Sequence, residues 1–135
     1  MKRFTVILII SSFLCISCVK NNSKNKDLIG KWKLTEVLVD PGNGKGIFNR
    51  VASDKTLEFF SNGTVVSNGN LCVMDTAAGQ QTGGTYSLKE KTIRPDNCQL
   101  EGTDLIIHFR LENDALVLQY SCMEPCFEKY VRIQK

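Results

Sequence analysis

Histidine is nearly missing from this chain: His108 is the only one among 135 residues. Nucleophile–base triads and catalytic zinc sites usually draw on histidine together with further partners or ligands. His108 lies between Ile107 and Phe109 in a run whose apolar residues alternate, so we expect its side chain on the outer face of a strand. No glycine-rich phosphate loop that follows a strand and opens a helix is recognisable. We therefore predict no catalytic residues, no metal site and no cofactor.

Helical periodicity and net charge are also lacking after Asp27. No stretch there repeats apolar residues at helical spacing between capping residues. From Leu28 onward there are 12 Lys or Arg and 13 Asp or Glu, so this part carries a formal charge of −1, whereas the whole chain carries +3. Domains that bind nucleic acid are usually strongly basic. The composition therefore argues against a nucleic-acid partner.

The beginning of the chain has the form of a bacterial export signal. Met1-Lys2-Arg3 is positively charged, and the apolar run from Phe4 to Ile16 is shorter than the roughly 20 residues that span a bilayer. The run leads into Ser17-Cys18, which resembles the lipobox of bacterial lipoproteins. The resemblance implies that residues 1–17 are removed and that Cys18 is acylated. We then expect a lipid anchor in a membrane of the cell envelope, the outer membrane being favoured; a plain secretory signal is the alternative.

The rest of the chain divides into a short tether and one domain. Residues 18–27 are rich in asparagine and lysine, which is typical of a flexible spacer between a lipid anchor and a domain. Residues 28–135 are enough for one modest hydrophobic core. We find no internal repeat and no sign of a second domain, and we expect a monomer.

The domain has the pattern of an all-β protein. Short apolar or alternating runs are separated by turn residues, including the Asn-Gly pair at 62–63, the tight turn 112–114 and a long Gly-rich loop at 40–54. About eight strands in sequence-neighbour hairpins protect their edges best by closing, which predicts a small antiparallel up-and-down barrel. The expected strands are 31–39, 57–60, 64–67, 85–88, 91–94, 105–111, 115–120 and 127–133.

The start of the domain resembles the lipocalins and related barrels. Gly30-Lys31-Trp32 matches their Gly-x-Trp opening, and the Asn-Gly hairpin after Phe60 matches lipocalin-like domains of bacterial lipoproteins. The resemblance implies that Gly30 and Trp32 close one barrel end and that Arg132, late in the chain, packs across the indole. It also implies a small, mostly apolar ligand. Four aromatic residues expected to point inward are candidates for lining its site, with plain core filling as the alternative: Phe59, Tyr86, Phe109 and Tyr120.

Four cysteines remain in the domain, and an exported location favours disulfides. Three pairings are possible, and we favour Cys122–Cys126 and Cys72–Cys98, because the first pair spans the turn between the last two strands. A four-cysteine zinc site is the alternative.

Two further expectations concern modification and function. Asp75-Thr76-Ala77 resembles an acceptor of bacterial O-glycosylation, which makes Thr76 a candidate site. The first function hypothesis is a membrane-anchored lipocalin-like module that binds or carries a small apolar ligand. The alternative is an envelope interaction or structural module with a filled barrel, whose loops bind a protein or a glycan. A cavity lined by the inward aromatics would favour the first, and a packed interior with an exposed apolar loop patch would favour the second.

Overall fold

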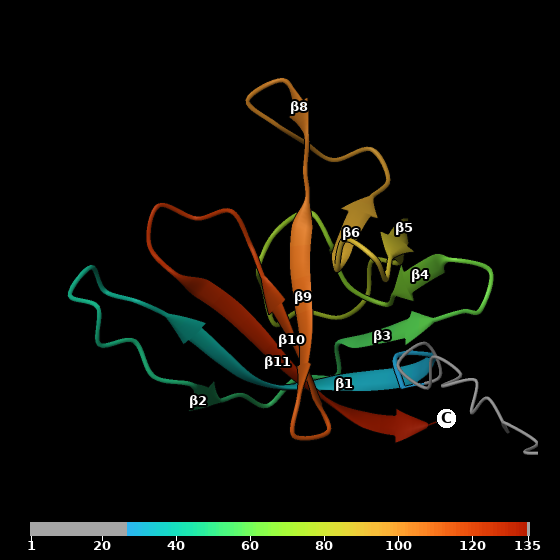
Figure 1. Cartoon of the computed structure of the whole chain (residues 1–135). Coiled ribbons are helices and arrows are strands. Elements are labelled where there is room, and N and C mark those ends of the chain that lie inside the picture. The colour runs from blue at the N-terminus through green and yellow to red at the C-terminus, as the bar shows by residue number, and fades with distance from the viewer. Residues whose placement is uncertain (1–26, 135) are drawn as a thin grey trace, which may run out of the picture.

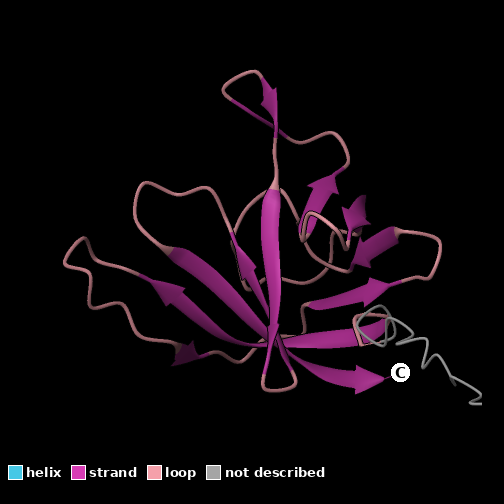
Figure 2. Cartoon of the chain, viewed as in Figure 1, coloured by secondary structure: helices cyan, strands magenta, loops and turns pink. Residues whose placement is uncertain are grey.

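The computed structural model describes residues 27–134, and this part of the chain is all-β, with eleven strands and no helix (Figures 1 and 2). It thus contains no helix of the length and apolar character needed to cross a membrane. The predicted signal 1–17, Cys18 and the tether up to Lys26 lie outside the described residues. The strands are β1 Gly30–Val39, β2 Asn49–Arg50, β3 Thr56–Phe59, β4 Thr64–Ser67, β5 Thr82–Ser87, β6 Thr92–Pro95, β7 Gln99–Leu100, β8 Thr103–Asp104, β9 Ile107–Glu112, β10 Ala115–Gln119 and β11 Cys126–Gln134.

Eight of these strands form a closed antiparallel barrel. They pair in the order β1-β3-β4-β5-β6-β9-β10-β11, and β11 pairs back onto β1. Neighbours in the barrel are thus neighbours in sequence, apart from the inserted short strands, which confirms the predicted up-and-down topology. The short strands were not predicted: β2 adds to β1, and β7 pairs with β8 as a separate hairpin. Each has two residues, too few for a pattern of alternation.

The seam between β1 and β11 is the longest pairing in the barrel. It runs from Lys31 opposite Gln134 to Val39 opposite Cys126, with irregularities between Lys31 and Trp32 and between Leu34 and Glu36. Bulges of this kind increase the local bend and twist of a strand. They allow β1 to pair with β3 along its first half while it follows β11 over its whole length.

The connections divide the barrel into two different ends. Short turns join β3 to β4, β5 to β6 and β9 to β10 at the end where β1 begins; we call this the closed end. The long connections 40–55, 68–81 and 96–106, together with 120–125, lie at the other end, which we call the mouth. In Figure 1 the β7–β8 hairpin and the loop after β1 project from the mouth, whereas the C-terminus lies toward the closed end.

The tight turns use residues that tolerate a left-handed backbone. Asn113 and Asp114 both have positive φ, 46° and 64°, as a two-residue hairpin turn requires. In the Asn-Gly turn only Gly63 has a positive φ, at 88°, and the Asn62 side chain accepts hydrogen bonds from the N–H and hydroxyl of Thr64. The side chain thus holds the turn in place of a second left-handed residue.

The barrel interior is densely filled with side chains. The buried hydrophobic cluster runs from Leu28 to Tyr130, so the described domain encloses its own core. Phe59 lies at the centre of an aromatic group, with its ring centroid 5.2 Å from that of Tyr86 and 6.3 Å from that of Phe109. Interlocking aromatic rings at such distances pack favourably. The centre of the barrel is therefore a packed core.

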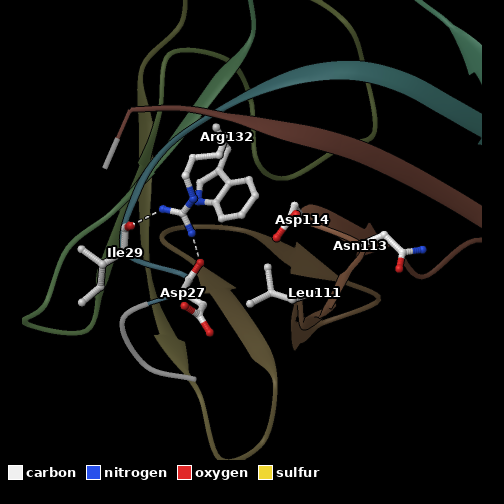
Figure 3. Close-up of a pocket in the computed structure, with 7 residues that line it drawn as sticks. Asp27, Ile29, Leu111, Asn113, Asp114 and Arg132 are labelled. Atoms are coloured by element: carbon white, nitrogen blue, oxygen red, sulfur yellow. Dashed lines mark hydrogen bonds between the residues drawn. The ribbon is translucent and has the colours of Figure 1, made fainter. Parts of the chain in front are cut away.

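Trp32 and Arg132 seal the closed end (Figure 3). The Trp32 side chain is buried, and its Nε1 donates to the carbonyl of Leu28 at 2.9 Å. The Arg132 guanidinium lies over the indole, 4.3 Å from the ring centroid. It also donates to the carbonyls of Ile29, at 2.6 Å, and Asp27. The segment that leads into β1 is thereby fixed across the barrel end.

The register of β11 explains why Arg132 reaches this position. Glu128 and Tyr130 face the interior, whereas Val131 and Ile133 point outward and are 40% and 51% exposed. Alternation therefore places Arg132 on the inward face, where the strand passes the barrel end. Leu111, which alternation also predicts to face inward, lies at the same end and is 38% exposed. Together with Asn113 and the charged Asp27, Asp114 and Arg132, it borders a half-open cavity of about 780 Å³ beside Trp32.

Removing Trp32 should destabilise the barrel strongly and abolish the contribution of Arg132. We expect Trp32→Ala to cost about 3–5 kcal/mol of unfolding free energy, because it opens a large cavity in a buried position. Arg132→Ala should cost less, and urea unfolding of the two single variants and the double variant should show that the two effects couple.

Arg110 supplies a matched control, because its guanidinium lies over a different ring, that of Phe127, at 5.1 Å. Arg110→Ala should be additive with Trp32→Ala. If the effects of Arg132→Ala and Trp32→Ala were also additive, the stacking of the guanidinium on the indole would contribute nothing measurable to the unfolding free energy.

Candidate functional site at the mouth of the barrel

A cavity of about 560 Å³ opens at the mouth; we call it the mouth cavity. Its walls come from the end of β1, the start of β11 and all four mouth connections, so segments far apart in sequence contribute to it. Its volume lies in the range typical of small-molecule sites, roughly 300–1,000 Å³, and barrel mouths are common places for such sites. The lining residues are Val39, Asp40, Cys72, Val73, Met74, Cys98, Gln99, Leu100, Leu105, Tyr120, Ser121, Cys122, Glu124 and Cys126.

Two disulfides fix the walls of the mouth cavity. Cys72–Cys98 joins the connection after β4 to the connection after β6, with the Cα atoms 5.5 Å apart. Cys122–Cys126 closes the turn between β10 and β11, with the Cα atoms 6.1 Å apart. This is the favoured pairing, and it is confirmed; it leaves none of these four thiols for the alternative zinc site. Because the links restrain irregular connections, the cavity is largely preformed.

The lining is apolar in its greater part and carries no cation. Val39, Val73 and Leu100 are 59%, 49% and 45% exposed, which is unusual for aliphatic side chains gathered at one place. The charged residues of the lining are Asp40 and Glu124, both acidic. The site therefore combines an apolar surface with negative charge at its edge.

Asp40 organises the loop that follows β1. Its carboxylate accepts hydrogen bonds from the backbone N–H groups of Gly42, Asn43 and Gly44 at 2.9–3.1 Å, and from that of Gly46 at 3.3 Å. Burial acts to raise the pKa of the Asp40 carboxyl, but the four N–H donors prevail and hold its pKa below the ordinary value. Asp40 is therefore ionised at neutral pH.

A fully buried ion pair lies beneath the mouth. The side chains of Lys55 and Glu128 both have no exposed surface, and Lys55 Nζ donates to Glu128 Oε1 at 3.0 Å. Lys55 Nζ also donates to the Asp75 carbonyl at 3.0 Å and lies 3.4 Å from its carboxylate. The backbone N–H of Asp75 in turn donates to Glu128 Oε1 at 3.1 Å. The pair thus ties the 68–81 connection to β11.

Two tyrosines complete the hydrogen bonding of Glu128. Its Oε2 accepts from the hydroxyls of Tyr120 at 3.1 Å and Tyr130 at 2.5 Å. Burial raises the pKa of Glu128, and Lys55 and the hydroxyl donors oppose that rise. Burial, together with the adjacent carboxylate, raises the pKa of both tyrosines well above the usual value. Both hydroxyls therefore remain protonated donors at neutral pH, and Tyr120 connects this network to the mouth cavity.

Sequence reasoning missed this network, although alternation contains the signal. Lys55 shares its strand face with Leu57 and Phe59, both buried. Glu128 shares its face with the buried Tyr130. Charged residues at inward positions are rare, so a pattern based on hydrophobicity places them outside.

The remaining predicted residues lie as follows. Among the four candidate ligand residues, Tyr120 lines the mouth cavity, whereas Phe59, Phe109 and the half-buried Tyr86 pack in the core. His108 is exposed on β9, as predicted. Thr76 is exposed on the 68–81 connection, where its carbonyl accepts from the hydroxyl of Ser53 at 2.8 Å. Its glycosylation stays a prediction, as does the acylation of Cys18.

A scan against protein-family models finds no match for the chain, and a search of the curated proteins finds none either. What the residues define is a closed eight-stranded barrel with a packed core, a sealed end and a disulfide-braced cavity at its mouth.

Breaking the buried ion pair should cost far more than breaking an exposed one. Glu128→Gln removes the main carboxylate from a lysine with no exposed surface, so we expect a loss of about 3–5 kcal/mol in unfolding free energy. Combining it with Lys55→Met should recover part of this loss, since the uncompensated charge is then gone. Chemical denaturation measures both.

The pair between Lys33 and Asp54 is the control, since its side chains are 41% and 90% exposed. Asp54→Asn should change the unfolding free energy by no more than about 1 kcal/mol. An equally small loss for Glu128→Gln would contradict the structural role assigned to the buried pair.

Proposed function

We propose that this protein is a lipid-anchored, lipocalin-like lipoprotein of the bacterial cell envelope that binds a small, mostly apolar molecule at the mouth of its barrel. The observation that carries the proposal is the mouth cavity: about 560 Å³, apolar in most of its lining and braced by two disulfides. A rigid, partly apolar concavity of this size gains affinity because little ordering is required when a ligand binds. The proposal needs no catalytic group.

The packed core favours the mouth over the barrel centre as the binding site. Phe59 and Ile107 have at most 1% exposed surface, and the aromatic group around Phe59 occupies the space that a deep ligand would need. The mouth, in contrast, exposes aliphatic side chains on a fixed frame. A ligand there covers apolar surface that water otherwise meets, which favours binding by roughly 25 cal/mol per Å² removed from water.

The anchor proposed at Cys18 would orient this site. Asp27 lies at the closed end, where its carbonyl accepts from Arg132. A spacer from Cys18 to Asp27 reaches at most about 30 Å when fully extended. An acylated Cys18 would therefore hold the closed end toward the bilayer, and the mouth would face away from it.

The anchor is tested by metabolic labelling with a tagged fatty acid. We expect label on the wild-type chain and none on a Cys18→Ala variant, because only the Cys18 thiol would carry the lipid. Cys15→Ala is the matched control and should keep the label. A Cys18→Ala chain that still takes up label and stays with membranes would overturn the anchor.

Binding at the mouth is tested with N-phenyl-1-naphthylamine, a neutral apolar probe whose fluorescence rises away from water. The probe should bind the exported chain from residue 18 onward, made lipid-free by Cys18→Ser, and Val73→Gln/Leu100→Gln should weaken binding on the order of tenfold, because it makes two lining residues polar. Val131→Gln/Ile133→Gln alters two equally exposed residues on the outer face of β11 and should change nothing. Equal loss in both variants, or no binding at all, would overturn the proposal.

A second candidate is an interaction module that uses the same mouth to bind a protein. Both features expected of such a module support it: the barrel centre is packed, and exposed apolar side chains lie on the mouth connections, among them Met123, which is fully exposed in the turn between β10 and β11. In this case the apolar rim would form the centre of a protein interface. A Met123→Gln variant that retains probe binding but loses a cross-linked envelope partner would support it.

A further inference from the structure

The mouth differs from the rest of the domain in its charge. Three of the four mouth connections contain no lysine, arginine or histidine at all: 68–81, 96–106 and 120–125. They carry five carboxylates, Asp75, Asp96, Glu101, Asp104 and Glu124. The domain as a whole is nearly neutral, so acidic residues are concentrated at this end.

The cations near the mouth do not reverse this charge. Lys55 is buried and its Nζ is occupied by Glu128 and Asp75, two carboxylates for one cation. The other basic residues of the mouth connections, Lys45 and Arg50, are exposed on the 40–55 segment and do not line the cavity. An anionic group in the mouth cavity would therefore meet no cation in the lining, only Asp40 and Glu124.

Resting on the function proposed above, we propose that the mouth cavity selects amphiphiles with a positively charged head, such as alkylammonium compounds, and disfavours fatty-acid-like anions. The aliphatic lining takes the alkyl part, and the acidic edge takes the head. Glu124, which is exposed at this edge, is the residue that we expect to face the charged head. Clefts lined by one sign of charge raise the local concentration of the opposite ion, so several modest interactions add up.

The test compares three probes with the same alkyl chain: decyltrimethylammonium, decanol and decanoate, below the concentrations at which they form micelles. Binding is followed by NMR on the chain from residue 18 with Cys18→Ser, labelled on its methionine methyl groups. Met74 lines the cavity and Met123 is next in sequence to two lining residues, so their methyl signals report binding there. Titration at pH 7 and low salt should give decyltrimethylammonium an affinity on the order of tenfold above decanoate, with decanol between them. The preference should shrink as salt is added.

Two variants with the same change in net charge make the test specific. Glu101→Gln/Glu124→Gln removes two carboxylates at the mouth and should reduce the preference to about threefold or less. Glu90→Gln/Asp114→Asn removes two exposed carboxylates at the closed end and should leave it unchanged.

Binding of decanoate as tight as that of the ammonium compound, or equal effects of the two variants, would overturn the charge selectivity and leave apolar binding intact. Failure of all three probes, decanol included, would overturn the proposed function together with it.

Discussion

The pairing of β1 with β11 is the constraint on which the rest of the structure depends. An open meander of eight strands would leave two edges with unpaired backbone groups, and closing the barrel removes both. Side chains of the two strands also interact across this seam. Nζ of Lys129 on β11 lies 2.7 Å from Oε2 of Glu36 on β1, and the Arg132 guanidinium stacks on the Trp32 indole. Without this pairing, the closed end and the buried ion pair beneath the mouth would each lose one of their two sides.

The buried network is the least expected consequence of this closure. Removing a lysine and a glutamate from water costs several kcal/mol for each ion, and their attraction recovers this only when all other polar atoms are satisfied. Here they are satisfied: Glu128 receives four hydrogen bonds, and Lys55 donates to two residues. Hydrophobic residues of equal size would give similar stability. The charged pair also holds the 68–81 connection in place. The backbone N–H of Asp75 donates to the Glu128 carboxylate, and Lys55 donates to the Asp75 carbonyl.

How much of the fold could be predicted from the sequence depends on the length of each pattern. The eight barrel strands follow from alternation and turn residues, since strands such as β9 and β10 extend over five or six residues. The Cys122–Cys126 disulfide follows from the turn between the last two strands. Cys72 and Cys98 are then the two cysteines that remain to be paired. The two-residue strands and the bulges in β1 do not, because their positions are set by pairing partners and leave no local pattern.

The candidate site was less predictable, and for a physical reason. Aromatic residues at inward positions are the obvious candidates for a ligand site in a barrel, but the same property makes them fill the core when the barrel is small, as Phe59 and Phe109 do. Which of them borders a cavity depends on depth along the strand: Tyr120 follows the last residue of β10 and so reaches the mouth. Depth is a property of how eight strands are staggered around the barrel. It cannot be read from one strand alone.

The two ends of the barrel differ in how their connections are built. Tight turns need few residues and leave no room for side-chain diversity, whereas the long mouth connections are free to vary but are costly to hold in place. Here two disulfides and the Asp75 contacts with the buried ion pair supply the restraint that strands would otherwise give. The restraint acts at the base of the connections and leaves Val73, Leu100 and Met123 exposed above it. The restraining contacts thus lie deeper in the barrel than the exposed apolar side chains. A binding surface on a small, rigid barrel would require this arrangement.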